Sequence, residues 1–320
     1  MLYIIKDKVY ITPGEWNRSK NIMEHSTFNS AGDLQQAMRD HGYIADDRTA
    51  LVLQLSSVLG KPVLIEGPAG AGKTELAKAW SRVLERSLIR LQCYEGIDED
   101  KALYEWNYQK QLLYIQSANP DENSRAKAQK DIFSGEFLLE RPLLQSIRSE
   151  RPSVLLIDEV DKSDQEFESF LLEVLSDWQV TIPEMGTLKA SSIPSVILTS
   201  NNTRELSHAL RRRCLYLYLD YPEEKKELDI LRLHQPGLKE ELGKTVVAFI
   251  RQLRLEKLRK RPSVSEVIDW VNTLAYMGVE KLDDSVVADT LSVLLKYRED
   301  CDTILEKLYR KDLPYGIPHS

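Results

Sequence analysis

Short apolar runs alternate with segments of helical periodicity over the first two thirds of the chain, and helical periodicity alone fills the last third. Runs of this length are typical of buried strands, and they occur at residues 62–66, 88–92, 153–157, 195–199 and 215–219. Apolar residues recur at helical spacing between them, at residues 46–59, 75–80, 136–149 and 165–177. Alternating strands and helices build parallel sheets, so the pattern predicts an α/β core over residues 41–222.

The pattern changes at Pro222, because no further strand run follows and helical spacing continues to about residue 310. We therefore expect a second, smaller and all-helical domain over residues 223–310. Within it, Ser263 and Glu266 are spaced as a capping box that opens a helix. Residues 311–320 lack such a pattern and are expected to form a loose tail.

Three further segments stand outside this regular alternation. Residues 1–40 form a weakly patterned leader, in which two short apolar runs predict a small hairpin. Residues 104–116 are rich in aromatic side chains with broken periodicity, which indicates an insertion in the form of a short hairpin. Residues 178–189 contain a proline and a glycine and are predicted to form another hairpin that projects from the core.

The loop after the first strand fits the pattern G-x-x-x-x-G-K-[ST] at every fixed position. It consists of Gly67, Pro68, Ala69, Gly70, Ala71, Gly72, Lys73 and Thr74, and Glu75 follows it at the start of a helix. Its glycines let backbone N–H groups turn inward around phosphate oxygens, and the helix N-terminus favours negative charge there. We expect Lys73 to reach the β- and γ-phosphates of ATP and Thr74 to ligate Mg²⁺. An ordinary glycine-rich turn is the alternative, but the flanking strand and helix favour a phosphate loop.

Two further strand runs end in side chains suited to nucleotide hydrolysis. The run at 153–157 ends in Asp158 and Glu159, and a buried parallel strand delivers such carboxylates to its carboxyl end. Asp158 would hold Mg²⁺ and Glu159 would orient or deprotonate the attacking water; a preference of acids for a helix N-terminus is the alternative. The run at 195–199 leads to Asn201, whose amide could position water beside the γ-phosphate or form a plain Asx turn.

Arginines and an apolar pair supply the remaining candidate contacts. Arg211, Arg212 and Arg213 precede the last strand run, and one guanidinium of such a cluster could reach the γ-phosphate of a neighbouring subunit. A solvated or salt-bridged cluster is the alternative for these arginines. Tyr43 and Ile44 precede the first core helix, where they could pack on the nucleotide base or simply on the core.

Composition narrows the functional classes. The chain has 320 residues, 42% of them hydrophobic and 29% charged, as in soluble globular proteins. Its net charge of −7 argues against a surface made for nucleic acid, although residues 251–261 hold six basic residues and one acid. We interpret that run as a solvated helix face in preference to a nucleic-acid stripe. Three widely spaced cysteines, no secretory signal and no apolar run of about 18 residues predict a cytoplasmic protein without a membrane span.

The order of these motifs resembles that of the AAA+ ATPases, and more narrowly that of the MoxR family. Further phrases, at residues 91–98, 104–108 and 137–139, are similar to the branch of that family encoded beside carbon monoxide dehydrogenase genes, the CoxD-like proteins. The likeness runs from about residue 42 to about residue 310. It implies a P-loop AAA+ core with a parallel sheet and a smaller helical lid. The segment at 104–116 then corresponds to the family's helix-2 insertion, and the segment at 178–189 to its hairpin before sensor 1.

The resemblance also assigns roles to residues and implies partners. The Walker roles fall to Lys73, Thr74, Asp158 and Glu159, sensor 1 to Asn201, and the arginine finger to Arg213 with Arg212 as its neighbour. The lid departs from the family pattern, because serine or glutamate stands where a sensor 2 arginine is expected, and Arg261 is the substitute. Relatives form hexamers, work with a protein that carries a von Willebrand factor A domain, and remodel or activate protein clients, including insertion of metal cofactors.

The sequence therefore predicts a Mg²⁺-dependent ATPase that forms a homo-oligomeric ring, in which Arg213 reaches the active site of the neighbouring subunit. The basic run at 251–261 leaves a DNA-associated AAA+ motor or loader as an alternative. A nucleotide-gated scaffold that barely hydrolyses ATP is a second alternative, against which the paired carboxylates at 158 and 159 speak. The sequence has no guanine-reading motif of a GTPase.

Overall fold

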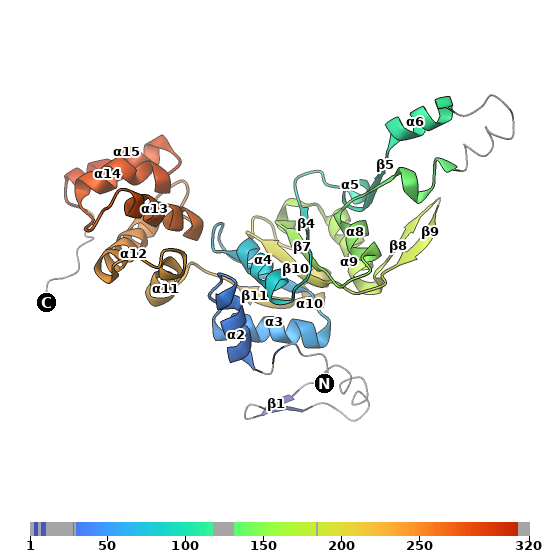
Figure 1. Ribbon diagram of the computed structural model, residues 1–320, viewed down its shortest axis with the longest axis horizontal. Coiled ribbons are helices and arrows are strands. Elements are labelled where there is room, and N and C mark those ends of the chain that lie inside the picture. Colours follow the sequence, from blue (N-terminus) through green and yellow to red (C-terminus); the bar gives the residue numbers. More distant parts are fainter. Residues whose placement is uncertain are drawn as a thin grey trace. The chain divides into compact units, whose positions relative to one another are not determined.

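The computed structural model describes residues 3–5, 8–10, 28, 30–117, 131–183 and 185–312. The chain divides into two compact units, which are drawn in Figure 1. Most of the first, which we name the sheet unit, consists of Ala45–Glu66 and Ala77–Leu217. Most of the second, the helical unit, consists of Gly67–Leu76 and the chain from Tyr218 onward. The phosphate loop therefore packs with the helices that follow the sheet in sequence.

A five-stranded sheet forms the centre of the sheet unit, in the order β11-β3-β10-β7-β4. Its strands are β3 (Val63–Glu66), β4 (Leu88–Gln92), β7 (Val154–Asp158), β10 (Ser195–Ser200) and β11 (Leu215–Tyr218). β10 pairs in parallel with both β3 and β7, and β4 pairs in parallel with β7. Every residue of β3 and β7 is buried. The apolar runs of β3 and β7 are thus strands covered on both faces, and the predicted α/β fold with a parallel sheet is confirmed.

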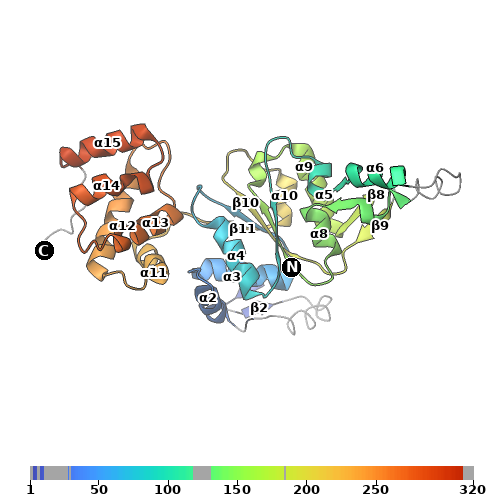
Figure 2. The same cartoon turned by 45° about the horizontal axis from the view of Figure 1, so that its top comes forward.

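Helices cover both faces of this sheet. In Figure 1 and Figure 2, α3 and α4 lie on one side of it and α8 and α9 on the other. Under α8 and α9, side chains such as Leu144, Leu155 and Leu171 have no exposed surface. The helices before β11 are α2 (Ala31–Asp40), α3 (Asp47–Leu59), α4 (Lys73–Val83), α5 (Glu99–Leu103), α6 (Tyr108–Ser117), α8 (Pro142–Arg148), α9 (Gln165–Asp177) and α10 (His208–Arg213).

Three antiparallel strand pairs accompany the main sheet in the part of the chain that the structure describes. They are β1 (Tyr3–Ile5) with β2 (Lys8–Tyr10), β5 (Tyr104–Trp106) with β6 (Leu138–Glu140), and β8 (Gln179–Ile182) with β9 (Gly186–Lys189). The first pair lies in the N-terminal leader, and the third forms a hairpin at the place where the proline and glycine of residues 178–189 indicated one. The described residues of the sheet unit also form two short 3-10 helices, η1 (Gly135–Phe137) and η2 (Val160–Lys162).

The structure corrects two sequence predictions in the middle of the chain. Residues 104–116 do not form a hairpin, because β5 continues into α6 and pairs with β6, which comes after residues 118–130 in sequence. Local periodicity cannot identify a partner strand that distant. Within residues 136–149 the α-helix begins only at Pro142, since β6 is extended by its pairing with β5 and proline favours the first position of a helix.

The helical unit packs its helices around one apolar core, in which Val246, Trp270 and Leu291 are almost completely buried. Its helices are α11 (Glu224–His234), α12 (Glu240–Leu255), α13 (Val264–Tyr276), α14 (Asp284–Leu294) and α15 (Arg298–Tyr309). Ser263 and Glu266 form the predicted capping box at the start of α13. None of the helices in the described part of the chain is long and apolar enough to cross a lipid bilayer.

The basic run at residues 251–261 is not one solvated helix face, because α12 ends at Leu255. Most of its cations are paired with acids of the same unit. The ion pairs are Arg251 with Glu224, Arg254 with Glu227, Arg259 with Glu299, and Lys260 with Glu266. Cations paired in this way are less available to phosphate backbones than free ones.

Candidate nucleotide site

The phosphate loop begins where β3 ends, and its close contacts require glycine. A Cβ atom on Gly67 would lie 1.8 Å from the carbonyl oxygen of Leu219, and one on Gly70 would lie 2.2 Å from the Cβ of Ser263. Gly70 also has a φ of 81°, in the left-handed region that side chains disfavour. The loop therefore uses glycine both for its turn and for its close approach to the residues after β11.

Lys73 opens α4 and is only 6% exposed. Its ammonium donates hydrogen bonds to the carbonyl oxygens of Gly67 at 2.7 Å and Pro68 at 2.9 Å. In the same turn of α4, Thr74 is half-buried and Glu75 is exposed. Phosphate oxygens are charged and accept stronger hydrogen bonds than neutral carbonyls, so a bound nucleotide would compete well for this ammonium.

Two carbonyl groups of the loop are held by residues that follow β11. The hydroxyl of Tyr221 donates to the carbonyl oxygen of Ala69 at 3.0 Å, and the backbone N–H of Val264 donates to that of Gly70 at 3.1 Å. The N–H of a peptide plane points opposite to its carbonyl. Anchoring these carbonyls to the helices therefore favours N–H groups that face the interior of the loop, as anion binding requires.

Tyr221 itself rests on a buried ion pair. The guanidinium carbon of Arg254 lies 4.4 Å from the centre of the Tyr221 ring. Arg254 Nη2 is 2.8 Å from Glu227 Oε1, and the two side chains are 8% and 0% exposed. Arg254 Nε also donates to the carbonyl oxygen of Pro262 at 3.0 Å. Burial raises the pKa of Glu227, and the charge of Arg254 opposes that rise.

The remaining candidate nucleotide contacts in the helical unit are Tyr43, Ile44 and Arg261. Tyr43 and Ile44 are half-buried, and the Tyr43 ring lies 3.9 Å from the position that a Cβ on Gly72 would take. Arg261 is exposed and makes no hydrogen bond or ion pair with the described residues. Burial raises the pKa of Tyr221, and the positive charges of Arg254 and Arg261 counteract this rise.

On the sheet unit, Asp158 is the last residue of β7 and is 2% exposed. Its Oδ2 accepts hydrogen bonds from Arg90, at 2.6 Å from Nη2 and 3.0 Å from Nε. Its Oδ1 accepts one from the hydroxyl of Thr199 at 2.5 Å. Arg90 lies on β4 and Thr199 on β10, the two strands that flank β7. Both carboxylate oxygens of Asp158 thus have a donor from a neighbouring strand.

Glu159 has φ 57° and ψ 48°, a left-handed conformation that stores strain in a residue with a side chain. Its N–H donates to the hydroxyl of Thr199 at 2.9 Å, which stabilises this turn. Its carboxylate accepts hydrogen bonds from Gln92 at 3.0 Å, Lys162 at 2.5 Å and Asn201 at 3.2 Å. The structure therefore brings together two residues that the sequence singled out separately, Glu159 and Asn201.

Asp161 fixes the loop that carries Asn201. Its carboxylate accepts from the N–H of Asn201 at 3.2 Å, and from the N–H and hydroxyl of Thr203 at 2.9 and 2.6 Å. Burial by itself would raise the pKa of Asp161, but these hydrogen bonds outweigh it and hold the pKa below the ordinary value of 3.8. The ionised carboxylate thereby anchors the backbone on which the Asn201 amide is mounted.

The three adjacent arginines have different surroundings. Arg211 pairs with the buried Glu66, with Nη2 at 2.6 Å from Oε1. Arg213 Nη1 donates to the carbonyl oxygen of Leu172 at 2.5 Å. Arg212 is exposed and has no hydrogen bond or ion pair with the described residues. The cluster is therefore partly salt-bridged, and Arg212 is its member most open to an external anion.

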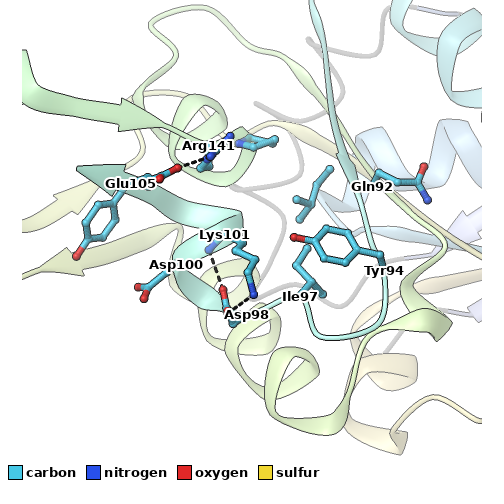
Figure 3. A pocket seen from close by; sticks show the side chains of 11 residues that line it. Gln92, Tyr94, Ile97, Asp98, Asp100, Lys101, Glu105 and Arg141 are labelled. Carbon is cyan, nitrogen blue, oxygen red and sulfur yellow. Dashed lines mark hydrogen bonds and ion pairs between the residues drawn. The ribbon is translucent and has the colours of Figure 1, made fainter. Parts of the chain in front are cut away.

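A pocket of about 640 Å³ adjoins the carboxyl end of β4, and Figure 3 shows its lining. Gln92, which donates to Glu159, is one of the lining residues. The others are Leu91, Tyr94, Ile97, Asp98, Asp100, Lys101, Tyr104, Glu105, Arg141 and Pro142. The two cations in this set are each paired with an acid of the same lining, as the dashed lines in Figure 3 indicate.

The available donors suit Mg²⁺. The carboxylate of Asp158 and the hydroxyl of Thr74 are hard oxygen ligands, which this ion prefers. No group of three or more His, Cys, Asp or Glu residues in the described ranges could hold a metal by itself. Mg²⁺ typically takes one or two carboxylates and completes its shell with phosphates and water, so this sparse donor set fits it. Cys93 supplies no thiolate, because burial, with a contribution from the charge of Asp158, raises its pKa to about 12.

Sequence reasoning missed the residues that orient the carboxylates. Arg90 and Gln92 are two positions apart in β4 and so share one face of that strand near its carboxyl end. Thr199 has the corresponding place near the end of β10. A polar side chain in the last positions of an apolar run was the signal that could have identified them. Tyr221 carried no comparable signal, since its contact depends on how the chain folds back after β11.

The chain passes directly from β3 of the sheet unit into the phosphate loop. Glu66, the last residue of β3, is in register with Ser200 of β10. Because β3, β10 and β7 run in parallel, the chain leaves β3 for the phosphate loop at the same edge of the sheet where Asp158 and Asn201 lie. Ligands of open α/β sheets bind at this carboxyl edge.

Parts of this chain are similar to known proteins. Residues 62–214 match the family model of the AAA domain, dynein-related subfamily. The gas vesicle ATPase GvpN of Haloferax mediterranei is 24% identical in an alignment 297 residues long, which covers 87% of this chain and 81% of that protein. An uncharacterized protein of Staphylococcus epidermidis is 24% identical in an alignment 247 residues long, which covers 73% of this chain and 85% of that protein. Among solved structures, a mutant form of Thermotoga maritima RuvB aligns with a TM-score of 0.48 and 16% identity, covering 88% of this chain and 79% of that one.

The family match covers the strands that supply the phosphate loop, the acidic end of β7 and the end of β10, together with α10. The similarity to GvpN extends over most of the chain. Residues 62–214 are therefore similar to an AAA domain, and this similarity supports a nucleotide-binding ATPase of the AAA+ kind.

Proposed function

We propose that the chain is a Mg²⁺-dependent ATP hydrolase in which the phosphate loop and the acidic end of β7 act on one nucleotide. The observation that carries this proposal is the set of contacts around Glu159, which lies in a strained turn beside Asp158 and accepts a hydrogen bond from the Asn201 amide. A carboxylate held in this way is suited to activating water. A scaffold that only binds nucleotide has no need of it.

In the proposed reaction the backbone N–H groups of the phosphate loop and the ammonium of Lys73 bind the phosphates of ATP. Glu159 accepts a proton from the attacking water, and Asn201 keeps that carboxylate and the water in line with the γ-phosphate. Asp158 and Thr74 would hold Mg²⁺, which neutralises charge on the phosphate oxygens when it is bound. The fixed orientation of these groups lowers the barrier because little reorganisation is needed during the reaction.

We further propose that the protein works as a homo-oligomeric ring, with an arginine of α10 acting on the nucleotide of the neighbouring subunit. The resemblance assigns this role to Arg213 with Arg212 beside it. The surroundings of the two arginines favour Arg212, which has no partner among the described residues, whereas Arg213 already donates to Leu172. A trans arginine explains an exposed cation at this position, since it would stabilise charge that develops on the transferred phosphate.

Within the AAA+ ATPases, we assign this protein to the MoxR type and its CoxD-like branch, because several of its sequence phrases resemble that branch. On that basis the protein would be a cytoplasmic hexamer that works with a von Willebrand factor A protein. It would remodel or activate client proteins, including enzymes that need a metal cofactor. Similarity to a protein named as a gas vesicle ATPase supports ATP hydrolysis without identifying the client. Motion of the helical lid would convert hydrolysis into work on that client.

The test is steady-state ATP hydrolysis against protein concentration, with the oligomer mass recorded alongside. Glu159→Gln should bind ATP normally and lose at least about a hundredfold in turnover. Arg212→Ala or Arg213→Ala should assemble normally and lose on the order of a thousandfold, whichever residue acts in trans. Arg298→Ala is the matched control, because the side chain of Arg298 is 90% exposed and its ion pair with Asp302 is long, at 3.6 Å.

The outcomes separate the proposals from one another. Specific activity that rises with assembly supports the ring, and activity of a monomer that neither arginine variant changes contradicts it. Wild-type protein that binds ATP with no measurable turnover would favour the nucleotide-gated scaffold instead. Full turnover of the Glu159→Gln variant would remove Glu159 from the mechanism.

A further inference from the structure

Arg90 makes a two-pronged contact with the carboxylate proposed to hold the metal. Both Nη2 and Nε of Arg90 donate to Oδ2 of Asp158, at 2.6 and 3.0 Å. In the register of the strands, Arg90 of β4 stands opposite Leu156 of β7, so its side chain reaches along the strand to the carboxyl end. The same Nη2 donates to Oε1 of Gln92 at 2.5 Å.

Gln92 extends this contact to the second carboxylate. Its Nε2 donates to Glu159 Oε2 at 3.0 Å, while its Oε1 accepts from Arg90. A continuous chain of hydrogen bonds therefore runs from Asp158 through Arg90 and Gln92 to Glu159. Moving the guanidinium would change the surroundings of both acids at once.

The two partners of the ion pair differ in exposure. The side chain of Asp158 is 3% exposed, whereas that of Arg90 is 49% exposed. The aspartate is fixed in the sheet and cannot reach solvent, but the arginine could rotate into water and keep its charge hydrated. Removal of the guanidinium therefore needs a replacement cation at Asp158 rather than any rearrangement of the sheet.

Mg²⁺ is that replacement. Oδ1 of Asp158 already accepts from Thr199, and Oδ2 accepts both contacts from Arg90. A divalent ion and a guanidinium on the same carboxylate repel each other, so both cannot hold Oδ2 at full strength. The geometry thus sets Arg90 and the metal in competition.

We propose that Arg90 is a positioning residue that neutralises Asp158 before metal arrives and withdraws from Oδ2 as the Mg²⁺–nucleotide binds. Its withdrawal frees Gln92 to reorient, so that metal entry is linked to the position of the Glu159 carboxylate. Arg90 thereby lowers the metal affinity of the site and makes its two acids respond together. This inference rests on the proposed function, because it assumes that Asp158 holds the metal.

The experiment uses Mn²⁺ as the metal and a non-hydrolysable ATP analogue, AMP-PNP, with free Mn²⁺ read from its electron paramagnetic resonance signal. Arg90→Gln should bind Mn²⁺ on the order of tenfold more tightly than wild type, because the competing charge is gone. Arg90→Lys keeps the charge but loses the fork of two donors, so its affinity should lie between the two. Arg148→Gln is the matched control, since Arg148 pairs with Glu140 on the surface of the same unit and should leave the affinity unchanged.

A second measurement guards against a folding effect. Without metal, thermal unfolding of Arg90→Gln should occur at a lower temperature than that of wild type, and saturating Mn²⁺ with AMP-PNP should close the gap. Equal or weaker Mn²⁺ binding by Arg90→Gln, in protein that melts cooperatively, would overturn the inference while the proposed function stands. If wild type binds no Mn²⁺ with the nucleotide analogue, and Lys73→Ala behaves identically, the proposed function fails and this inference fails with it.

Discussion

Two arginine–carboxylate pairs, one in each unit, have similar distances and very different surroundings. Arg254 and Glu227 in the helical unit are both nearly buried, whereas Arg90 of the sheet unit is half exposed beside the buried Asp158. A pair that is buried on both sides cannot open without leaving a charge in an apolar environment. A pair with one exposed member can open whenever another cation takes its place. The Arg254–Glu227 pair therefore stabilises the helical unit, whereas the arginine of the Arg90–Asp158 pair can be replaced by another cation.

The largest expected effect is the loss of the buried pair. Glu227→Ala should reduce the free energy of unfolding of the helical unit by about 3–5 kcal/mol, because it leaves the Arg254 guanidinium buried and unpaired. Chemical denaturation followed by circular dichroism measures this. Glu280→Ala removes an exposed partner of Lys239, and it should lower the free energy of unfolding by well under about a quarter of the loss in Glu227→Ala. Similar losses in the two variants would contradict the distinction between buried and exposed pairs.

A smaller effect should follow from Asp161→Asn, which keeps the shape of the side chain and removes its charge. We expect a loss of about 1.5–3 kcal/mol at neutral pH, because the hydrogen bonds from Asn201 and Thr203 then have a neutral acceptor. The pKa of Asp161 is lower in the folded state than the ordinary 3.8, so its contribution is complete above that pH. The contribution is lost as the pH falls through the lower, folded-state pKa.

Denaturation as a function of pH tests this sign. Wild type should lose stability on acidification through that window, and Asp161→Asn should lack this part of the loss. Asp100→Asn, at an exposed position of the same unit, is the control and should follow the wild-type curve. An unchanged acid profile in Asp161→Asn would show that the carboxylate does not anchor the Asn201 loop.

Tyr221→Phe removes one hydrogen bond from the contact between the phosphate loop and the helices. The ring stays on Arg254, so the expected cost in stability is only about 1 kcal/mol. Without this hydrogen bond the carbonyl of Ala69 is no longer held, and the phosphate loop loses one of its anchors. Nucleotide affinity should therefore fall several-fold, as measured by titration calorimetry with ADP. Tyr276→Phe is the control at a tyrosine that is 92% exposed. Normal affinity in Tyr221→Phe would mean that the loop keeps its shape unaided.

The smallest effect is expected at a wholly surface pair. Arg148→Gln breaks an ion pair with Glu140 in which both partners are well hydrated, and it should change the free energy of unfolding by about 0.2–1 kcal/mol. The change should shrink further at high salt, which denaturation at low and at roughly 1 M NaCl would reveal. A large, salt-independent loss would place this arginine with the structural pairs.

Local patterns were sufficient for most of the elements. The helix over Asp47–Leu59 lies within residues 46–59, where helical spacing predicted one, and the structure adds an Asp46 cap at its start and a left-handed Gly60 at its end. The helix over Gln165–Asp177 and the capping box at Ser263 also follow from spacing alone. Prediction was wrong at residues 104–116, where a strand pairs with a segment beyond residue 130. Spacing within a segment carries no information about such a partner.

The phosphate loop, the paired acids of β7 and the order of strands and helices were thus determined by the sequence itself, because each depends on neighbours within a few residues. The contacts that give these residues their chemistry were decided only by the tertiary structure. Asp158 meets Arg90 across 68 positions of sequence and Thr199 across 41, and Tyr221 meets Ala69 across 152. The strand order β10-β7-β4 places β7 between strands that lie far from it along the chain, and so packing of the sheet, rather than local propensity, selects the partners of each acid.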